Sequence, residues 1–468
     1  MLPRKTKIIA TLGPATQSPD MIRRLIETGV DVFRLNMSHA KHDWTREIVK
    51  NIREQSTACG RSVATLVDLQ GPSIRTGELD EALVLEAGDT VEFRNADLEP
   101  SEKRSTTTNY DGLADDVAVG DVMLVDNGVI HFKVIRKEPG RLICEALTEG
   151  TMGSRRHINL PGVKVNLPPL TKKDQHDIEL AAELDVDFVA ISFVRDARHV
   201  QNLREILVER GCQARIVSKI EDQEAVKKLR QIIEASDAVM VARGDLGIEV
   251  HLEELPVVQR TILQECARVG RKVIVATHML ESMVENPVPT RAEVTDVANA
   301  VYEQADAVML SGETSVGHYP LKCIEVIDRI ARRMEREPGA RFSDEIELRT
   351  EKQHSVKSAV VLANSLPESK IIVFTARGVL ANYIAHQRPE NAPIFAFCPD
   401  AKICRALHLN RAVTSFPMEF GDRPETTIHN AIEFLRERGQ VETGDPIVVL
   451  SDVLTGDFDT EAILLRKA

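Results

Sequence analysis

The sequence predicts an α/β protein built around a (β/α)8 barrel, with a small β-rich domain inserted into it and an α/β domain after it. Three observations lead to this prediction. Eight short apolar, β-rich runs alternate with helical patterns. Polar residues recur where these runs end, and the alternation is interrupted between residues 70 and 168. It resumes in the last third of the chain as a separate unit.

The eight apolar runs are five to seven residues long. Short strands that alternate with helices indicate βα units and a parallel sheet, and eight such units are the number that closes a barrel. A doubly wound open sheet remains possible on periodicity alone. The runs are KIIATL (7–12), DVFRLN (31–36), VATLVD (63–68), FVAISFV (188–194), RIVSKI (215–220), AVMVA (238–242), KVIVAT (272–277) and AVMLS (307–311). Helical patterns lie between most of them, for example at 18–28, 43–58, 171–184, 196–210, 222–235, 256–269 and 290–304.

The polar residues at the run ends favour the closed barrel. Any one of them could be a helix cap or a turn residue, but a barrel active site requires convergence at the carboxyl ends of several strands. The residues concerned are Arg34, Asn36, Asp68, Lys219, Glu221, Asp245, Thr277, Ser311 and Glu313.

The expected domain limits follow from composition. Residues 70–168 are rich in Gly, Asp, Thr and Val, carry the turn signals DGL, DNG and EPG, and show no convincing helix. This segment is predicted to be a β-rich lid inserted after the third strand, so that the barrel comprises residues 1–69 and 169–345. Residues 346–468 are predicted to form the C-terminal α/β domain, with strands at KIIVFT (370–375), PIFAF (393–397), AVTSF (412–416), PIVVLS (446–451) and EAILL (461–465).

Bulk composition excludes several classes of protein. A formal net charge of −13 and an aromatic content of 4% argue against nucleic-acid binding, which needs a basic face and stacking platforms. No apolar run approaches the roughly 20 residues that span a bilayer. The seven cysteines are scattered without a CxxC pair, which is typical of reduced thiols, and the N-terminus does not resemble a signal peptide. A cytoplasmic protein is expected.

The segment SKIED places Lys219 and Glu221 two residues apart at a strand end, so both side chains can point to one side. Such a pair can be a simple salt bridge. With Asp245 from the next strand, however, two carboxylates and few other ligands suit Mg²⁺ or Mn²⁺ bound together with an anionic substrate. Lys219 would then be a fixed positive charge facing an oxyanion or phosphoryl group.

Other residues near the strand ends suit an anion. Gly244 lacks a Cβ and lets backbone N–H groups approach a carboxylate or phosphate. Arg34 offers a planar, bidentate donor, and Thr277 offers a hydroxyl that could relay a proton. Arg75 and Arg156 lie on the inserted segment, so a second polyanion could bind between it and the barrel. A Walker-type phosphate loop and the protein-kinase signatures are both absent from the sequence.

Two other hypotheses fit part of this pattern. The tripeptide Arg243-Gly244-Asp245 could be an adhesion motif, which would require an exposed tripeptide and a route of export. The barrel could instead be an aldolase or mutase that acts on an enolate with Mg²⁺, but such enzymes need no inserted domain with Arg75 and Arg156 to bind a second polyanion.

With these residues assembled, the chain closely resembles the pyruvate kinase family over nearly its whole length. The matching segments are TKIIATLGPAT, VFRLNMSHA, DLQGPSIRTG, INLPG, SKIED, MVARGDLGIEV, VATHMLESM, NPVPTRAEVTDVANAV and AVMLSGETSVGHYP. The resemblance implies phosphoryl transfer from phosphoenolpyruvate to ADP in the last step of glycolysis, with Mg²⁺ or Mn²⁺ and K⁺ as cofactors. It also implies allosteric control and a homotetramer.

The resemblance further implies roles for individual residues. Arg34 contacts phosphate, Lys219 stabilises the transition state, and Thr277 is a candidate for protonating the enolate. The other implied positions are the divalent-metal ligands Glu221 and Asp245, the substrate contacts Gly244, Asp245 and Thr277, the potassium ligands Asn36, Ser38, Asp68 and the carbonyl of Leu69, and the nucleotide contacts Asn36, His39, Arg75 and Arg156.

Some positions depart from the family pattern. Ser73 stands where potassium-requiring members usually carry glutamate and potassium-independent members lysine. Asn127 replaces a frequent aspartate. Arg377 and Leu380 in FTARGVLA (374–381) replace small hydroxyl residues of a sugar-phosphate loop. Both the potassium requirement and the identity of an effector are therefore left open by the sequence.

Overall fold

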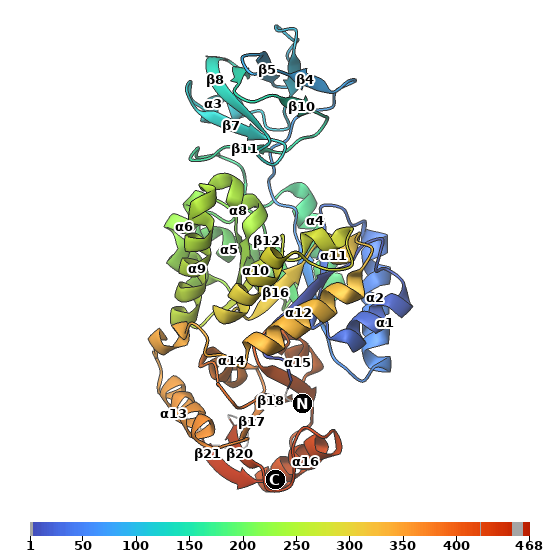
Figure 1. The fold of residues 1–468 in the computed structure, drawn as a ribbon, viewed down its shortest axis with the longest axis vertical. Helices are drawn as coiled ribbons and strands as arrows, with labels where there is room; N and C mark the ends of the chain where they lie inside the picture. The colour runs from blue at the N-terminus through green and yellow to red at the C-terminus, as the bar shows by residue number, and fades with distance from the viewer. Residues whose placement is uncertain (1–2, 422, 452–461) are drawn as a thin grey trace.

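A closed barrel of eight parallel strands forms the centre of the molecule (Figure 1). The structure, a computed structural model, describes residues 3–421, 423–451 and 462–468. Going round the barrel, the strand order is β1-β16-β15-β14-β13-β12-β3-β2, so the closed alternative was correct and the open sheet is excluded. The strands are β1 (Lys7–Thr11), β2 (Val32–Asn36), β3 (Ala64–Asp68), β12 (Phe188–Ile191), β13 (Arg215–Ile220), β14 (Ala238–Ala242), β15 (Lys272–Ala276) and β16 (Ala307–Leu310).

The barrel helices pack their apolar sides onto the outer face of the strands, and small and branched side chains fill the interior. Two helices begin with a capping box, Thr171 with Asp174 and Thr290 with Glu293, which satisfies backbone donors at the helix start. The helices are α1 (Pro19–Thr28), α2 (His42–Ala58), α4 (Lys172–Glu183), α5 (Ala197–Glu209), α6 (Gln223–Lys227), α7 (Leu229–Ala235), α8 (Arg243–Glu249), α9 (Leu255–Val269), α10 (Arg291–Tyr302), α11 (Gly312–Ser315) and α12 (Pro320–Met334). Short 3₁₀ turns lie at η1 (Leu252–Glu254), η2 (Glu281–Val284) and η3 (Phe342–Glu345).

The inserted domain stands above the carboxyl ends of the barrel strands (Figure 1). It has its own core and consists of a six-stranded and a two-stranded sheet. The expectation that it holds no helix was wrong in one detail, because α3 (Leu113–Asp116) forms a single short helix. Its strands are β4 (Leu83–Leu85), β5 (Thr90–Arg94), β6 (Ser105–Thr107), β7 (Val122–Val125), β8 (Ile130–Glu138), β9 (Arg141–Ala146), β10 (Gly150–Met152) and β11 (Ile158–Asn159).

The C-terminal domain is a five-stranded sheet in the order β19-β18-β17-β20-β21, in which only β21 runs antiparallel. The predicted fifth strand is present, although Glu461 lies outside the described residues. The elements are α13 (Glu351–Ser365), β17 (Lys370–Phe374), α14 (Val379–His386), β18 (Ile394–Cys398), α15 (Ala401–Leu407), β19 (Val413–Pro417), α16 (Pro424–Glu437), β20 (Pro446–Ser451) and β21 (Ala462–Lys467). The exact limits between the three domains stay a prediction.

The C-terminal domain closes the amino end of the barrel. Ala406 and Leu409 belong to the same apolar cluster as the barrel interior. Beside them, Arg388 is buried and paired with Asp306, with an N–O distance of 2.6 Å. His408 of the C-terminal domain is buried as well. The two domains are therefore joined by packing as well as by the connecting chain.

The buried His408 predicts acid sensitivity. Burial, with Lys7, Arg61 and Arg405 nearby, lowers the pKa of His408 to about 3. Below the ordinary histidine pKa of about 6.5, this histidine is protonated in the unfolded chain but stays neutral in the folded chain. The free energy of unfolding therefore falls by about 1.4 kcal/mol for each unit by which the pH is lowered. We expect His408→Gln to remove this contribution from the slope, measured as the urea midpoint between about pH 5 and pH 7. An unchanged slope in the variant would contradict the prediction.

All seven cysteines are free thiols, six of them buried. Among the helices of the described residues, none has the length and apolar content needed to cross a bilayer.

Candidate active site

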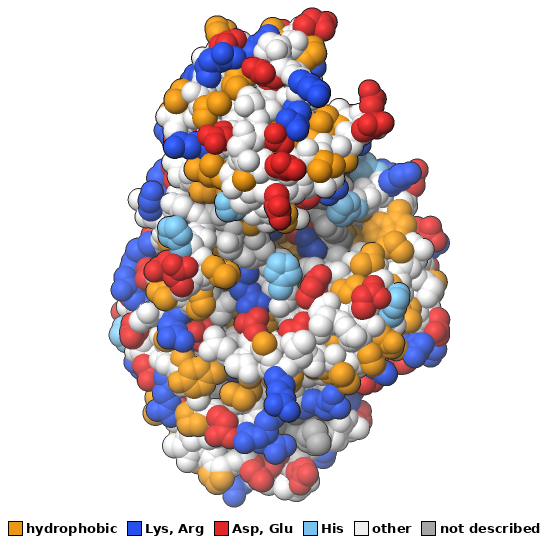
Figure 2. Space-filling view, turned by 45° about the horizontal axis from the view of Figure 1, so that its top comes forward, with side chains coloured by type: hydrophobic (Ala, Val, Ile, Leu, Met, Phe, Trp, Pro, Cys, Tyr) orange, Lys and Arg blue, Asp and Glu red, His pale blue; other side chains and the backbone are white. Residues whose placement is uncertain are grey.

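The predicted site residues gather at the carboxyl ends of the barrel strands, beneath the inserted domain. Figure 2 shows this region as a hollow between the two domains, with basic, acidic and histidine side chains around it. The strand register explains the gathering: Asn36 lies opposite Asp68 in the pairing of β2 with β3, and Lys219 lies opposite Met240 in the pairing of β13 with β14. Strand ends from distant parts of the chain therefore meet at one level.

Lys219 is the cationic centre of the site. Its Nζ lies 2.8 Å from Glu221 Oε1 and 3.5 Å from Asp68 Oδ1, and it donates a hydrogen bond of 2.8 Å to Ser192 Oγ. Burial alone would lower the pKa of Lys219, but the carboxylates of Asp68 and Glu221 raise it above its ordinary value. The side chain is thus a permanent cation held in a fixed place.

Glu221 and Asp245 supply negative charge next to Lys219. Burial raises the pKa of Glu221 to about 7, in opposition to Lys219 and with a further contribution from the nearby Asp245. One Glu221 oxygen accepts the N–H of Phe193 at 2.6 Å, whereas Oε1 is buried without an aligned hydrogen bond. Among the described residues none donates a hydrogen bond to the Asp245 side chain.

This donor set fits a hard divalent cation. Two neighbouring carboxylates concentrate negative charge, and such an environment favours the binding of Mg²⁺ or Mn²⁺. Within the described ranges, His, Cys, Asp and Glu side chains do not form a group of three or more around a possible metal position. A cation held by Glu221 and Asp245 would therefore complete its shell with water and substrate oxygens.

Arg34 supplies a second buried cation. Its Nε and Nη2 both lie 2.7 Å from Asp68 Oδ2, and its Nη1 donates to Thr11 Oγ1 at 3.1 Å. Asp68 therefore has one oxygen held by Arg34, while its Oδ1 is buried without a hydrogen bond. Lys219 and Arg34 share this carboxylate and stand on both sides of it.

Thr277 and Gly244 are joined directly. The Gly244 N–H donates to Thr277 Oγ1 at 2.7 Å, and the hydroxyl donates to the carbonyl of Ala276 at 2.6 Å. Thr277 and His278 have φ values of 65° and 54°, a left-handed backbone that costs a non-glycine residue energy and marks functional sites. A Cβ on Gly244 would lie 3.6 Å from Thr277, an ordinary contact, so protein packing alone does not demand glycine here.

Arg243 has a structural role: it links the start of α8 to the segment after β15 and to α10. Its guanidinium bonds Asp296 at 2.7 Å and the carbonyls of Ala276 and Thr277 at 3.1 and 2.6 Å. The Arg243 side chain is only 9% exposed and begins helix α8. The adhesion hypothesis required an exposed tripeptide and is therefore wrong.

The predicted potassium ligands come from two neighbouring strand ends: Asp68 and Leu69 at the end of β3, and Asn36 and Ser38 at the end of β2 and in the turn after it. The Ser38 N–H donates to Asn36 Oδ1 at 3.1 Å, and the Leu69 carbonyl accepts the Ser192 hydroxyl at 2.8 Å. Ser73, at the position that differs from the family pattern, contacts Arg75 Nε through its hydroxyl at 3.3 Å. The position of Ser73 therefore provides no cationic side chain of the kind that potassium-independent members carry there.

An apolar pocket of about 570 Å³ adjoins this turn. It contains two of the predicted nucleotide residues, Asn36 and His39, next to Trp44, whose indole N–H donates to Gln17 at 2.9 Å. An aromatic ring in an apolar pocket beside a cationic centre suits a purine base. The remaining lining residues are Thr11, Leu12, Gly13, Pro14, Ala40, Lys41, Ser315 and Val316.

The two predicted lid arginines are not part of this pocket. Arg75 Nη1 donates to the Arg155 carbonyl at 3.1 Å, and Arg156 Nη1 lies 3.3 Å from Asp126. Both stay within the inserted domain in this conformation. Their contact with a nucleotide remains a prediction that requires movement of the lid.

Three residues of the site were not predicted from the sequence. Ser192 and Phe193 lie near the end of the run FVAISFV, and their contacts to Lys219 and Glu221 arise from strand pairing that no local pattern reveals. Phe193 also has a positive φ of 53°, which aims its N–H at Glu221. Trp44 could have been noticed as the only tryptophan of the chain.

Fold and site together define a lidded (β/α)8-barrel protein with cationic and carboxylate groups converging at the carboxyl mouth, where the enzymes of this fold carry their active sites. Family profiles described as "Pyruvate kinase, barrel domain" and "Pyruvate kinase, alpha/beta domain" match residues 3–324 and 354–464. The chain belongs to the pyruvate kinase family.

Individual relatives are similar over almost the whole chain. Plastidial pyruvate kinase 2 of Arabidopsis thaliana is 39% identical over 96% of this chain and 78% of its own length. The pyruvate kinase of Dictyostelium discoideum is 37% identical over 97% of this chain and 92% of its own. The crystal structure of a pyruvate kinase from Cryptosporidium parvum superimposes with a TM-score of 0.93 at 33% identity, covering 98% of this chain and 96% of that one.

Proposed function

We propose that this protein transfers the phosphoryl group of phosphoenolpyruvate to ADP and releases pyruvate and ATP. The observation that carries the proposal is the cluster of Lys219, Glu221 and Asp245 on neighbouring strand ends, facing the buried Arg34. This cluster places two fixed cations and two carboxylates around one position. An aldolase or mutase would have no use for the Trp44 pocket beside it.

In the proposed reaction the P–O bond of phosphoenolpyruvate breaks, the β-phosphate of ADP takes the phosphoryl group, and the enolate gains a proton at its methylene carbon. Arg34 and Lys219 hold the phosphoryl oxygens and stabilise the charge that spreads over them in the transition state. Gly244 leaves room for the carboxylate of the substrate. Thr277 orients this edge of the site and is a candidate donor for the final proton.

Glu221 and Asp245 would hold Mg²⁺ or Mn²⁺, which would supply positive charge against the anionic oxygens of the substrate. K⁺ would be held by Asn36, Ser38, Asp68 and the Leu69 carbonyl. Because Ser73 brings no cationic side chain to substitute for K⁺, we propose that the ion is required. Assembly as a homotetramer, action in the cytoplasm and control through the loop at 374–381 belong to the same proposal.

The proposal is tested by mixing purified protein with phosphoenolpyruvate, ADP and Mg²⁺ and following pyruvate with lactate dehydrogenase and NADH. We expect pyruvate formation that depends on all three components and is much faster with K⁺ than with Na⁺. No pyruvate under either salt would contradict the function. Equal rates in the two salts would contradict only the potassium requirement.

The apolar pocket predicts a role for Trp44 in holding the nucleotide base. Trp44→Ala should raise the KM for ADP about tenfold through lost stacking, with little change in kcat or in the KM for phosphoenolpyruvate. Trp44→Phe keeps a ring in the pocket and should restore most of the affinity. ADP should also quench the fluorescence of this single tryptophan in the wild type. A rise in the KM for phosphoenolpyruvate instead would place the nucleotide elsewhere.

A further inference from the structure

The inserted domain meets the barrel at the end of the helix that carries Gly244 and Asp245. Asn159 of β11 donates through its Nδ2 to Oε1 of Glu249, which is the last residue of α8, over a long 3.4 Å. At the tip of the neighbouring hairpin, a Cβ on Gly128 would lie 3.5 Å from Ile248. Two separate parts of the lid therefore lie next to the last two residues of α8.

The Asn159 amide is only half satisfied. The residue is 4% exposed, and its Oδ1 is buried without a hydrogen-bond partner. A buried acceptor left without a donor costs about 1–3 kcal/mol. The hydrogen-bond partner of its Nδ2 is the carboxyl of Glu249, which can supply the missing donor when it carries a proton.

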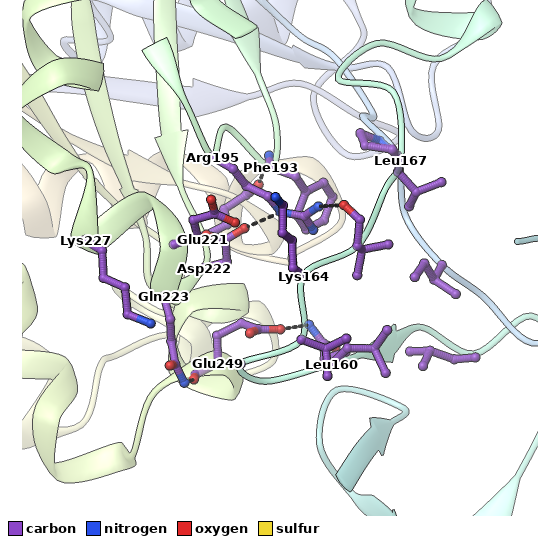
Figure 3. A pocket seen from close by; sticks show the side chains of 18 of the residues that line it. Leu160, Lys164, Leu167, Phe193, Arg195, Glu221, Asp222, Gln223, Lys227 and Glu249 are labelled. Carbon is purple, nitrogen blue, oxygen red and sulfur yellow. Dashed lines mark hydrogen bonds and ion pairs between the residues drawn. The ribbon is translucent and has the colours of Figure 1, made fainter. Parts of the chain in front are cut away.

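The position of Glu249 is itself fixed from the metal side of the barrel. The side-chain amide of Gln223, two residues after the metal-ligand candidate Glu221, donates to the backbone carbonyl of Glu249 (Figure 3). Glu249 therefore lies at the end of the helix that carries Asp245 and contacts both the segment after Glu221 and the lid.

Glu249 is poised to hold a proton near neutrality. Burial raises its pKa to about 7, with Asp222 and Asp245 adding to the rise while the Asn159 hydrogen bond and Arg195 oppose it. Arg195 is neutralised by Asp222 at 2.8 Å, and Lys228 by Glu224 at 2.9 Å. The other charged or titratable groups around the same hollow are His157 and Lys164 of the lid and Glu221 and Lys227 of the barrel.

We infer that protonated Glu249 and Asn159 form a reciprocal carboxyl–amide pair that positions the lid over the metal-binding end of α8. In this pair Asn159 Nδ2 donates to Oε1, and the Oε2 hydroxyl donates to the otherwise unpartnered Oδ1. Loss of the proton removes one of the two hydrogen bonds and leaves Oδ1 facing a negative charge. The inference deepens the proposed function and rests on it only for the consequence in catalysis.

Glu249→Gln is the decisive variant, because an amide can make both hydrogen bonds at any pH. Hydrogen exchange of the lid segment 156–165 is measured on the full-length, metal-free protein, comparing the variant with the wild type at equal pH so that intrinsic rates cancel. We expect equal exchange at about pH 6 and about fivefold faster exchange of the wild type at about pH 8.5, the loss of one hydrogen bond. Glu253→Gln, an exposed residue of η1, is the matched control and should follow the wild type.

Asn159→Leu, which cannot make either bond, should exchange fast at both pH values. Equal exchange of wild type and Glu249→Gln at both pH values, or protection in Asn159→Leu like that of the wild type, would overturn the pair. In turnover the ratio of kcat/KM between Glu249→Gln and wild type should rise about fivefold from about pH 6 to about pH 8.5. A flat ratio despite altered exchange would overturn the positioning role. Failure of both proteins to form pyruvate would refute the proposed function while leaving the exchange result standing.

Discussion

Replacing Lys219 with methionine is expected to lower kcat by about 10³-fold while the affinity for Mn²⁺ stays equal or rises. Lys219 is a largely buried cation, with 12% of its side chain exposed, and it is held by Ser192, Asp68 and Glu221. Its charge opposes that of a bound metal in the ground state but stabilises the phosphoryl oxygens in the transition state. Lactate dehydrogenase coupling measures turnover, and electron paramagnetic resonance of Mn²⁺ measures binding.

Removal of a buried cation can also destabilise the fold, since Asp68 and Glu221 lose a partner. Thermal unfolding of the variant must therefore be measured alongside its activity. Lys50→Met is the matched control, because the Lys50 side chain is 74% exposed and makes only a 3.9 Å surface contact with Glu54. If Lys219→Met loses Mn²⁺ binding together with activity, Lys219 is structural and its catalytic role is refuted.

Replacing Asp245 with asparagine is expected to weaken Mn²⁺ binding by at least about 100-fold, with turnover falling accordingly. Within the described chain this carboxylate receives no hydrogen bond or ion pair, so the substitution removes charge without breaking a structural contact. The fold should therefore keep its thermal stability. Glu221→Gln is a less selective substitution, because Glu221 also accepts the Phe193 N–H and pairs with Lys219, so the change would disturb structural contacts as well as the metal site.

Asp20→Asn is the matched control for this series. Asp20 forms an exposed pair with Arg23 on α1, on the outside of the barrel, and its loss should change neither metal affinity nor rate. Unchanged Mn²⁺ affinity in Asp245→Asn would remove Asp245 from the metal site and leave Glu221 as the sole carboxylate candidate.

The predictable part of the structure follows from local patterns. Apolar runs such as KVIVAT and AVMVA became buried barrel strands because parallel strands covered on both faces are continuously apolar. The spacing of Lys219 and Glu221 correctly placed both side chains together, since alternate residues of a strand share a face. The helix predicted at 43–58 is present as α2, but no local pattern indicated that its Trp44 would line a pocket.

The sequence by itself determined the βα rhythm, the inserted β-rich segment and the residue types that meet at the strand ends, because helix and strand periods are written locally. Only the tertiary structure decided which groups are partners. The pairing of Arg34 with Asp68, the hydroxyl of Ser192 on Lys219, the N–H of Phe193 on Glu221 and the contact of Asn159 with Glu249 join distant segments. Such contacts depend on the register at which the eight strands close and on the position of the inserted domain relative to the barrel. Local sequence propensities determine neither of these.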